Sequence, residues 1–311
     1  MPTREINCSG VRWINLEKPK REEVMALAGH FPFHSLNIDD CMSKIQLTKV
    51  EEHDDYLFVI LRFPVLCGGS GCTPSQVSFF VGRDYLVSVH DGSIGALNDL
   101  FTSCEIKFKE TGKFTQDGVG SLFYMIFSTI VNSLFPLMES LMDRLEDLEE
   151  NVFSKNSEAL YEITRLRRSI ADVRRILSPI RRVIVEISDG VRRQTGDDLD
   201  LYFSDVHDRI EKIWELSETS KEIIEIYKDT DYTLYQHRMN RAIVILTVIS
   251  TLTAPAMVLG TLYGMNIILP GSVNEEPWLF LGPYTTFIII SILSLIPAGF
   301  MIAYFKRLGW L

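Results

Sequence analysis

Apolar residues gather in two long runs near the C-terminus of the chain. Residues 242–266 read AIVILTVISTLTAPAMVLGTLYGMN, and up to Tyr263 they hold no ionisable side chain apart from that tyrosine. A second run, residues 278–305, follows after a short linker. A helix of about 20 apolar residues crosses the roughly 30 Å hydrocarbon layer of a bilayer. The pattern therefore predicts a hairpin of two membrane-spanning helices at the end of an otherwise water-soluble chain.

The part of the chain before these runs changes its periodicity near residue 118. Upstream, short runs rich in Val, Ile, Phe and Tyr alternate with Gly-containing turns, which predicts strands. Downstream, apolar residues recur at spacings of three and four, which predicts long helices over residues 121–153 and 157–188. The expected strands cover residues 12–16, 56–65, 76–81 and 85–90, and the expected shorter helices cover residues 19–28 and 94–110.

A long helix is predicted to lead into the first span. From about Asp198 the chain has no Pro or Gly until Pro255. A helix that is unbroken from there to Tyr263 would be on the order of 100 Å long. The predicted fold class is therefore α-rich overall: an α+β cytoplasmic domain, with a mixed sheet and helices, followed by long stalk helices and a C-terminal two-helix transmembrane hairpin.

This organisation divides the chain into seven parts. They are an α/β cytoplasmic domain (1–115), to which the family resemblance described below assigns metal sensing, an antiparallel helical pair (116–197), a long stalk helix (198–241), the first span (242–266), an external loop (267–277), the second span (278–305) and a basic cytoplasmic tail (306–311).

Charged residues next to the apolar runs predict the orientation in the membrane. Basic residues lie before the first run and directly after the second, namely Arg238, Arg241, Lys306 and Arg307. The linker has no Lys or Arg and carries Glu275 and Glu276. Because basic residues are enriched on the cytoplasmic side, both termini are expected in the cytoplasm of a cell-membrane protein, with the linker outside.

Composition narrows the possible partners. The net charge of −10 and the pI near 5.2 argue against nucleic-acid binding and fit attraction of cations. The first ten residues are polar and no hydrophobic segment follows them, so no secretory signal is predicted. All five cysteines precede the first span and would lie in reducing cytoplasm, where disulfides are not expected. Cys67 and Cys72 flank the Gly-rich CGGSGC segment, for which a hairpin turn is favoured over an incomplete zinc site.

One face of the first span combines small, hydroxyl-bearing and apolar residues. Asn240, Thr247, Ala254 and Thr261 recur every seven residues, Ser250 and Met257 fall close to the same stripe, and Ile243 and Leu246 lie at its inner end. Such a stripe suits either close helix packing or the wall of a water-filled pore. By itself the stripe favours packing.

The sequence at the end of the first span shifts the preference from helix packing to a pore wall. Tyr263-Gly264-Met265-Asn266, directly before an acidic linker, resembles the signature of the CorA family of magnesium channels, in which a Gly-Met-Asn triplet follows the first of two C-terminal spans. The segments WINL (13–16), HSLNIDDC (34–41) and QVSFFVGRDYLVSVHD (76–91) also resemble the cytoplasmic domain of CorA proteins. The resemblance implies a homo-oligomer, a pentamer, that transports Mg²⁺, uses no organic cofactor, and has Gly264, Met265 and Asn266 as its selectivity filter.

The resemblance also implies a regulatory magnesium site. Asp40 in NIDDC and Asp205 in YFSDVHD match positions at which CorA proteins keep two aspartates that face each other across subunit boundaries. Mg²⁺ bound there would neutralise their repulsion and hold the subunits together, and its loss would let the long helices splay. The alternative is that each aspartate is a helix cap or a solvated surface residue. Asp39 and Asp208 are neighbours that could substitute.

The first span also limits the transport chemistry. It has no Asp, Glu or His, so a pore made from it cannot compensate a bare divalent charge in a low dielectric. Mg²⁺ sheds water reluctantly, and passage of the hydrated ion is therefore expected. Asn266 side chains and Gly264 or Met265 carbonyls would contact its waters, while Glu275 and Glu276 would raise the local cation concentration. Further roles are a hydrophobic constriction (Ile243, Leu246 and Met257), an inner polar ring (Asn240), and either a basic collar or lipid anchors (Lys306 and Arg307).

Some features depart from the family pattern. The segment ILPGSVNEEPW replaces the Met-Pro-Glu-Leu that CorA channels commonly carry after the triplet, and the basic tail is short. Transport of Zn²⁺, Co²⁺ or Ni²⁺ therefore stays open, although the lack of His and Cys in the spans and linker favours Mg²⁺.

Two other classes of protein are also open. One is a non-conducting, membrane-anchored metal sensor. The other is a membrane enzyme built on His34, Asp39, Asp40 and His90. These four residues have no recognised ligand spacing, so no enzymatic activity is predicted.

Overall fold

The chain forms two compact units, Met1–Lys228 and Asp229–Leu311. The structure is a computed structural model of all 311 residues, and it describes residues 3–8, 10–43, 46–66, 71–112, 118–152, 157–265, 269 and 284–310. We describe each unit by itself.

A six-stranded mixed sheet forms the centre of the N-terminal unit. Its strands are β1 (Thr3–Cys8), β2 (Val11–Glu17), β3 (Lys49–Glu52), β4 (Leu57–Leu66), β5 (Cys72–Val81) and β6 (Tyr85–His90). The spatial order is β1-β2-β6-β5-β4-β3, with β2 and β6 parallel and every other pair antiparallel. The four strands predicted from the sequence are all present. The two that were missed, β1 and β3, are the edge strands, whose charged residues hide the apolar signal.

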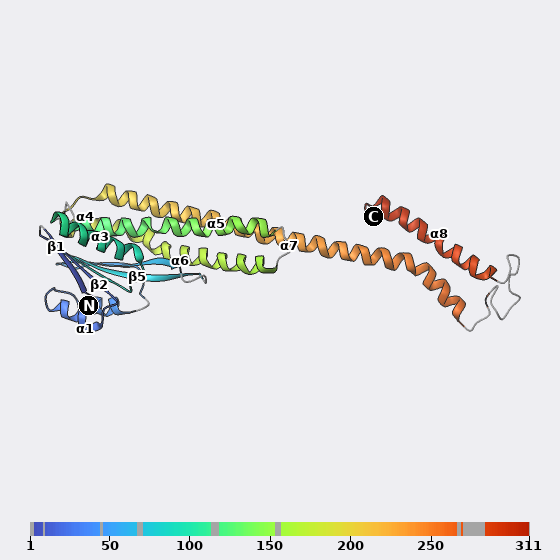
Figure 1. Cartoon of the computed structure of the whole chain (residues 1–311), viewed down its shortest axis with the longest axis horizontal. Helices are drawn as coiled ribbons and strands as arrows, with labels where there is room; N and C mark the ends of the chain where they lie inside the picture. Colours follow the sequence, from blue (N-terminus) through green and yellow to red (C-terminus); the bar gives the residue numbers. More distant parts are fainter. Residues whose placement is uncertain are drawn as a thin grey trace. The chain divides into compact units, whose positions relative to one another are not determined.

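Helices cover both faces of this sheet, as Figure 1 shows. The helices of this unit are α1 (Arg21–Ala28), α2 (Ser35–Met42), α3 (Gly95–Thr111), α4 (Gly118–Asn132), α5 (Leu134–Val152), α6 (Ser157–Thr195) and the first part of α7 (Asp200–Gly264). Successive side chains of a strand point to opposite faces. Leu57 and Val59 of β4 thus join the core under α3–α7, while Phe58 and Ile60 join the core under α1 and α2.

The helix predicted over residues 121–153 is in fact two helices, α4 and α5, which break at Ser133. Pro136 explains the break, because it has no N–H to donate to the carbonyl of Asn132. The Ser133 hydroxyl instead donates to the carbonyl of Ile130 at 2.7 Å. The prediction of one uninterrupted helix was therefore wrong.

The helix predicted over residues 157–188 extends further, as α6, to Thr195. Gly190 suggests a helix end in the sequence, but here it lies inside the helix. A Cβ at Gly190 would come within 2.7 Å of Leu57 Cδ1, so glycine lets α6 approach the sheet closely. The helix ends at Gly196, whose φ of +80° and N–H bond to the Arg192 carbonyl, 2.9 Å long, form a left-handed cap.

Helix α7 runs without interruption for 65 residues, as predicted, and passes from one unit into the other. In the N-terminal unit its Phe203 packs against Phe123 and Phe127 of α4, with ring centroids 6.2 and 6.4 Å apart. Trp214 lies under two guanidinium groups of α6, with Arg174 Cζ 4.9 Å and Arg181 Cζ 4.3 Å from a ring centroid. This part of α7 belongs to the protein core.

The C-terminal unit holds the rest of α7 and helix α8 (Thr285–Arg307). Three helical stretches of the described residues are long and apolar enough to cross a membrane: Gly118–Leu148, Asp200–Gly264 and Thr285–Arg307. Half of the apolar window of the first is buried within the protein, against 6% for the second and 0% for the third. The first stretch is thus part of the soluble core, and the other two coincide with the predicted membrane spans.

Candidate functional site

The stripe of α7 predicted to face a pore is exposed in the single chain. All of its members except the half-buried Thr247 are exposed: Asn240, Ile243, Leu246, Ser250, Ala254, Met257 and Thr261. The exposed fraction reaches 68% at Met257 and 64% at Leu246. Large apolar side chains that stay this exposed require lipid or another subunit around them.

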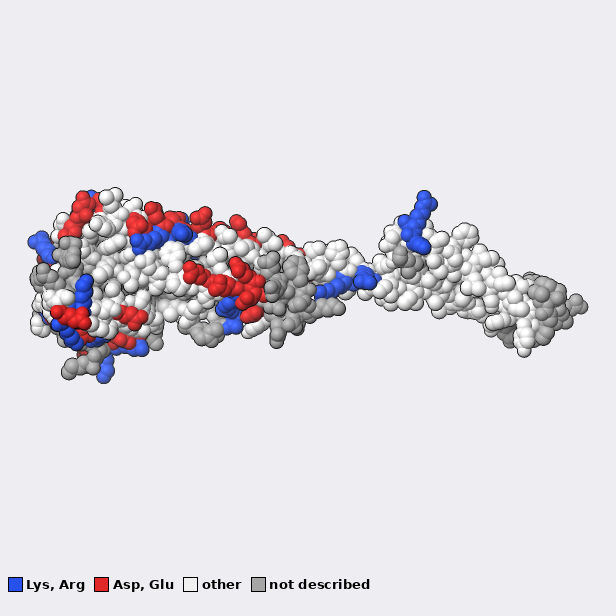
Figure 2. Space-filling model, turned by 45° about the horizontal axis from the view of Figure 1, so that its top comes forward, with Lys and Arg blue, Asp and Glu red and all other residues white. Residues whose placement is uncertain are grey.

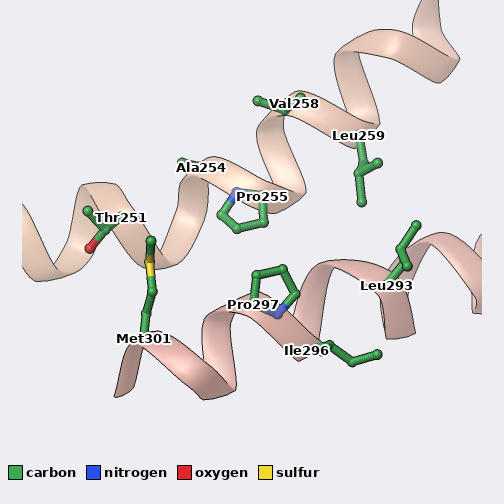
Figure 3. Close-up of a pocket in the computed structure, with 9 residues that line it drawn as sticks. All are labelled: Thr251, Ala254, Pro255, Val258, Leu259, Leu293, Ile296, Pro297 and Met301. Carbon is green, nitrogen blue, oxygen red and sulfur yellow. The ribbon is translucent and has the colours of Figure 1, made fainter. Parts of the chain in front are cut away.

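A groove between α7 and α8 occupies a different face of α7. Figure 3 shows Pro255 of α7 facing Pro297 of α8 across this groove, whose volume is about 590 Å³. The other lining residues are Thr251, Ala254, Val258 and Leu259 of α7 and Leu293, Ile296 and Met301 of α8. Ala254 therefore lies at the border between the stripe and the groove.

The less exposed positions of α7 show the same division. In the apolar run, Val248 is buried, and Val244, Thr247, Thr251, Leu252, Pro255, Leu259 and Tyr263 are half-buried. On a helix with 3.6 residues per turn, the centre of this set lies roughly 130° from the centre of the predicted pore stripe. Contacts with α8 thus leave most of the stripe free.

The threonines of the stripe have a defined hydrogen-bond role. Thr247 Oγ1 donates to the carbonyl of Ile243 at 2.8 Å, and Thr261 Oγ1 donates to the carbonyl of Met257 at 2.7 Å. A hydroxyl whose proton is used in this way presents only acceptor lone pairs to its surroundings. Such oxygens can accept hydrogen bonds from the water shell of a cation.

The outer end of α7 is described as far as Met265. Gly264 is the last helical residue, and the Met265 N–H donates to the carbonyl of Leu262 at 3.2 Å. Met265 is 49% exposed. Asn266, Glu275 and Glu276 lie outside the described residues, and their predicted roles stay predictions.

Basic residues of the C-terminal unit lie directly before the apolar run of α7 and at the C-terminal end of α8. Arg238 and Arg241 precede the apolar part of α7, and Lys306 and Arg307 form the last turn of α8. Figure 2 shows the Lys and Arg side chains of this unit as two groups, and the described residues 242–265 and 284–305 carry no Lys, Arg, Asp or Glu. This is the charge distribution expected for a hairpin whose two ends lie on one side of a membrane.

Asp40 lies on α2 and is bound by two side chains. Its Oδ1 accepts from Gln46 Nε2 at 2.7 Å, and its Oδ2 accepts from Lys49 Nζ at 2.6 Å. The Asp40 side chain is 21% exposed. It is therefore not a helix cap but a partly buried, paired carboxylate.

Asp205 lies on α7, in the N-terminal unit, and forms an ion pair with Arg209 one turn further on. The same guanidinium donates to Ser128 Oγ at 2.9 Å and to Asn132 Oδ1 at 3.0 Å on α4. The Asp205 side chain is 53% exposed. It can therefore be reached from outside the protomer.

One chain does not bring the two aspartates together. Helix α2 packs on one face of the sheet through Ile38, whereas α7 packs on the opposite side through Phe203 and Val206. A site that uses both Asp40 and Asp205 therefore needs two copies of the chain.

The residues of the alternative enzyme site are engaged separately. His34 caps α2 by accepting the N–H of Leu36 at Nδ1, and Asp39 pairs with Arg21 at 2.5 Å. His90 is buried at the end of β6. Within the described ranges, no group of three or more His, Cys, Asp or Glu side chains could hold a metal ion. The structure thus offers no metal-hydrolase cluster among these residues.

Comparison with known proteins establishes the family of the chain. The profile of the family described as CorA-like Mg²⁺ transporter protein matches residues 9–307, nearly the whole chain. The chain belongs to the CorA family. It is therefore a member of a family of divalent-cation transporters, and its α7 and α8 are membrane helices.

Several relatives match along almost their full length. The chain is 28% identical to "Putative metal ion transporter YfjQ" of Bacillus subtilis, over 96% of this chain and 89% of that protein. It is 25% identical to "Cobalt/magnesium transport protein CorA" of Thermotoga maritima, over 96% and 83% of the two chains. The solved complete CorA magnesium transporter of Methanocaldococcus jannaschii superposes with a TM-score of 0.83 at 24% identity, covering 97% of this chain and 92% of that one. This similarity confirms the predicted CorA fold.

Sequence reasoning missed two cationic residues of this CorA protein that pair with the candidate carboxylates. Arg209 could have been found, since it follows Asp205 by four positions on a helix, the spacing of a neighbouring pair. Lys49 had no such signal. It reaches Asp40 only because β3 lies beside the end of α2 in the folded chain.

Proposed function

We propose that this CorA protein assembles into a membrane channel that lets hydrated Mg²⁺ enter the cell down its electrochemical gradient. The exposed stripe of α7 is the observation that carries this proposal. One helix per chain cannot enclose a pore, so several copies must place their stripes around a common axis. The number five is taken from the family resemblance.

The pathway would have three levels. At the outer mouth, Gly264 and Met265 carbonyls and the Asn266 amide would contact the water shell of the ion, and Glu275 and Glu276 would attract cations to it. Along the span, Thr247 and Thr261 would offer further acceptors to these waters. Further in, Met257, Leu246 and Ile243 would form a hydrophobic constriction that closes by dewetting. Near the cytoplasmic end, Asn240 would form a polar ring, and Lys306 and Arg307 would form a basic collar.

The electrical gradient suffices to drive entry. A divalent ion gains roughly 4.6 kcal/mol per 100 mV of membrane potential. The basic residues at one end of the α7–α8 pair support an orientation with both termini in the cytoplasm. The gradient would then drive cations towards the N-terminal unit.

The channel would be closed by cytoplasmic Mg²⁺ bound between Asp40 of one subunit and Asp205 of the next. The exposure of Asp205 and the separation of the two residues within one chain support this arrangement. Co²⁺ is a second candidate substrate, because the Thermotoga maritima relative is named as a cobalt/magnesium transport protein.

Reconstitution tests the proposal. Full-length protein in liposomes that contain a Mg²⁺-sensitive dye should admit Mg²⁺, and Asn266→Ala should slow entry about tenfold or more, since each subunit loses a polar contact to the hydrated ion. Thr253→Ala is the matched control. Thr253 is an exposed residue of α7 off the stripe, and among the described residues its hydroxyl bonds to the carbonyls of Ile249 and Ser250 of its own helix. No entry with wild type would indicate a non-conducting sensor, and equal rates for Asn266→Ala and wild type would remove Asn266 from the filter.

A further inference from the structure

Each proposed regulatory carboxylate already has a cationic partner within its own chain. Lys49 Nζ lies 2.6 Å from Asp40 Oδ2, and the Arg209 guanidinium pairs with Asp205. A divalent cation that arrives at either carboxylate therefore meets a positive charge before it binds.

Lys49 is held in place by more than Asp40. Its ammonium also donates to Glu51 Oε1 at 2.6 Å and lies 5.6 Å from the centroid of the Phe58 ring. Two carboxylates and an aromatic face therefore hold its positive charge beside Asp40.

Arg209 is fixed from a second helix. Its Nη1 donates to Ser128 and Asn132 of α4 while its Nη2 binds Asp205. A guanidinium does not lose its proton in proteins, so this charge is permanent. The hydrogen bonds to α4 keep it close to Asp205 when another cation approaches.

We propose that Lys49 and Arg209 are resident counter-ions that compete with cytoplasmic divalent cations for Asp40 and Asp205. This inference rests on the regulatory site of the proposed function. To bridge the two carboxylates, a divalent ion must displace both cations or remain a few ångströms from them, and like charges at that distance repel. The two side chains therefore raise the Mg²⁺ concentration at which the channel closes. They also reduce the repulsion between the aspartates when Mg²⁺ is absent.

The test measures the Mg²⁺ concentration that half-inhibits influx. Full-length protein is reconstituted so that the N-terminal unit faces a lumen with preset Mg²⁺, and entry is followed with a dye. Lys49→Met and Arg209→Gln should each lower the half-inhibiting concentration about two- to fivefold, the range expected for a partly exposed ion pair. The charge-preserving Lys49→Arg and Arg209→Lys should keep the wild-type value.

Arg21→Gln is the matched control, since it removes a cation that pairs with the neighbouring carboxylate Asp39 on α2. It should leave the half-inhibiting concentration unchanged. If Lys49→Met fails to fold, the Arg209 variants decide alone. An unchanged or higher half-inhibiting concentration in the variants that lack the charge overturns the inference.

A double variant separates this inference from the site on which it rests. Asp40→Asn with Asp205→Asn should abolish inhibition by lumenal Mg²⁺. Full inhibition in that double variant would remove the regulatory site itself. Loss of inhibition there, together with wild-type values in Lys49→Met and Arg209→Gln, would keep the site and reject only the counter-ions.

Discussion

The two units of the protein differ in what covers their apolar helices: other parts of the chain in the N-terminal unit, and surroundings outside the chain in the C-terminal unit. The Gly118–Leu148 stretch, α7 and α8 are each long and apolar enough to cross a membrane. In the N-terminal unit, α4 and α5 bury this surface against a sheet and against α6, as Leu122, Ile126 and Leu141 illustrate with no exposed area. In the C-terminal unit, only 6% of the apolar window of α7 and none of that of α8 is buried by the chain itself.

This difference shows that hydropathy alone does not identify a membrane helix. Whether an apolar helix is a membrane helix depends on what covers it, and the sequence shows this partly through the presence or absence of a charged face. Helix α5 carries charged residues on one face, so only the other face needs cover. The apolar run of α7 has no charged face, and only lipid or other subunits can cover it.

The largest predicted effect contrasts one buried and one exposed side chain of these helices. Leu141→Ala should destabilise the N-terminal unit by about 2–5 kcal/mol, because it leaves a cavity in a packed core. Ile249→Ala, at a position 55% exposed on α7, should cost less than about 1 kcal/mol.

Hydrogen exchange of the β4 and β5 amides, followed in the full chain in lipid nanodiscs, measures the first effect. Exchange of α7 amides measures the second. Similar destabilisation by the two substitutions would contradict the contrast between a protein core and a lipid-facing helix.

A smaller effect concerns pH and belongs to the N-terminal unit. His90 is buried, with Nε2–H donating to Asn15 Oδ1 at 3.1 Å and Nδ1 accepting the N–H of Gly92. Burial lowers its pKa from the ordinary value of 6.5, although the charges of Glu17 and Asp91 oppose the shift. Below pH 6.5 the unfolded chain therefore takes up a proton that the folded chain does not. Stability should fall as the pH drops from 6.5 towards the folded pKa.

Urea midpoints of the sheet, measured between pH 7.5 and 5.5, check this slope. His90→Gln removes the titrating group and should flatten the pH dependence, even if it lowers stability at every pH. A slope that is equally steep in His90→Gln would assign the pH dependence to other groups. The apolar run of α7, which has no His, should not contribute to it.

Much of the fold could be predicted from the sequence, because central strands and amphipathic helices show their own periodicity. The 65-residue α7 was predicted from the absence of Pro and Gly before Pro255. The break at Ser133 was missed, although Pro136 marks it. The extension of α6 beyond residue 188 was also missed, because the close approach of Gly190 to Leu57 has no local pattern in the sequence.

The candidate site could be predicted only in part. The stripe on α7 follows from helical spacing, and the structure adds that α8 packs elsewhere on the helix. The pairing of Asp40 with Lys49 depends on tertiary contacts between α2 and β3, which spacing cannot give. A contact between Asp40 and Asp205 involves two chains, so neither the sequence nor the fold of one chain determines it.

Cysteine accessibility tests most directly whether the stripe of α7 lines a water-filled path. Ser250→Cys and Met257→Cys lie on the stripe, and Ile249→Cys lies on another exposed face of the same helix. The five native cysteines all lie within the first 104 residues, so the unmodified chain gives the background. A charged, water-soluble thiol reagent should modify Ser250→Cys and Met257→Cys in liposomes and block Mg²⁺ entry, while Ile249→Cys should stay unmodified in lipid. Equal modification at all three positions, or faster modification at Ile249→Cys, would contradict a pore lined by this stripe.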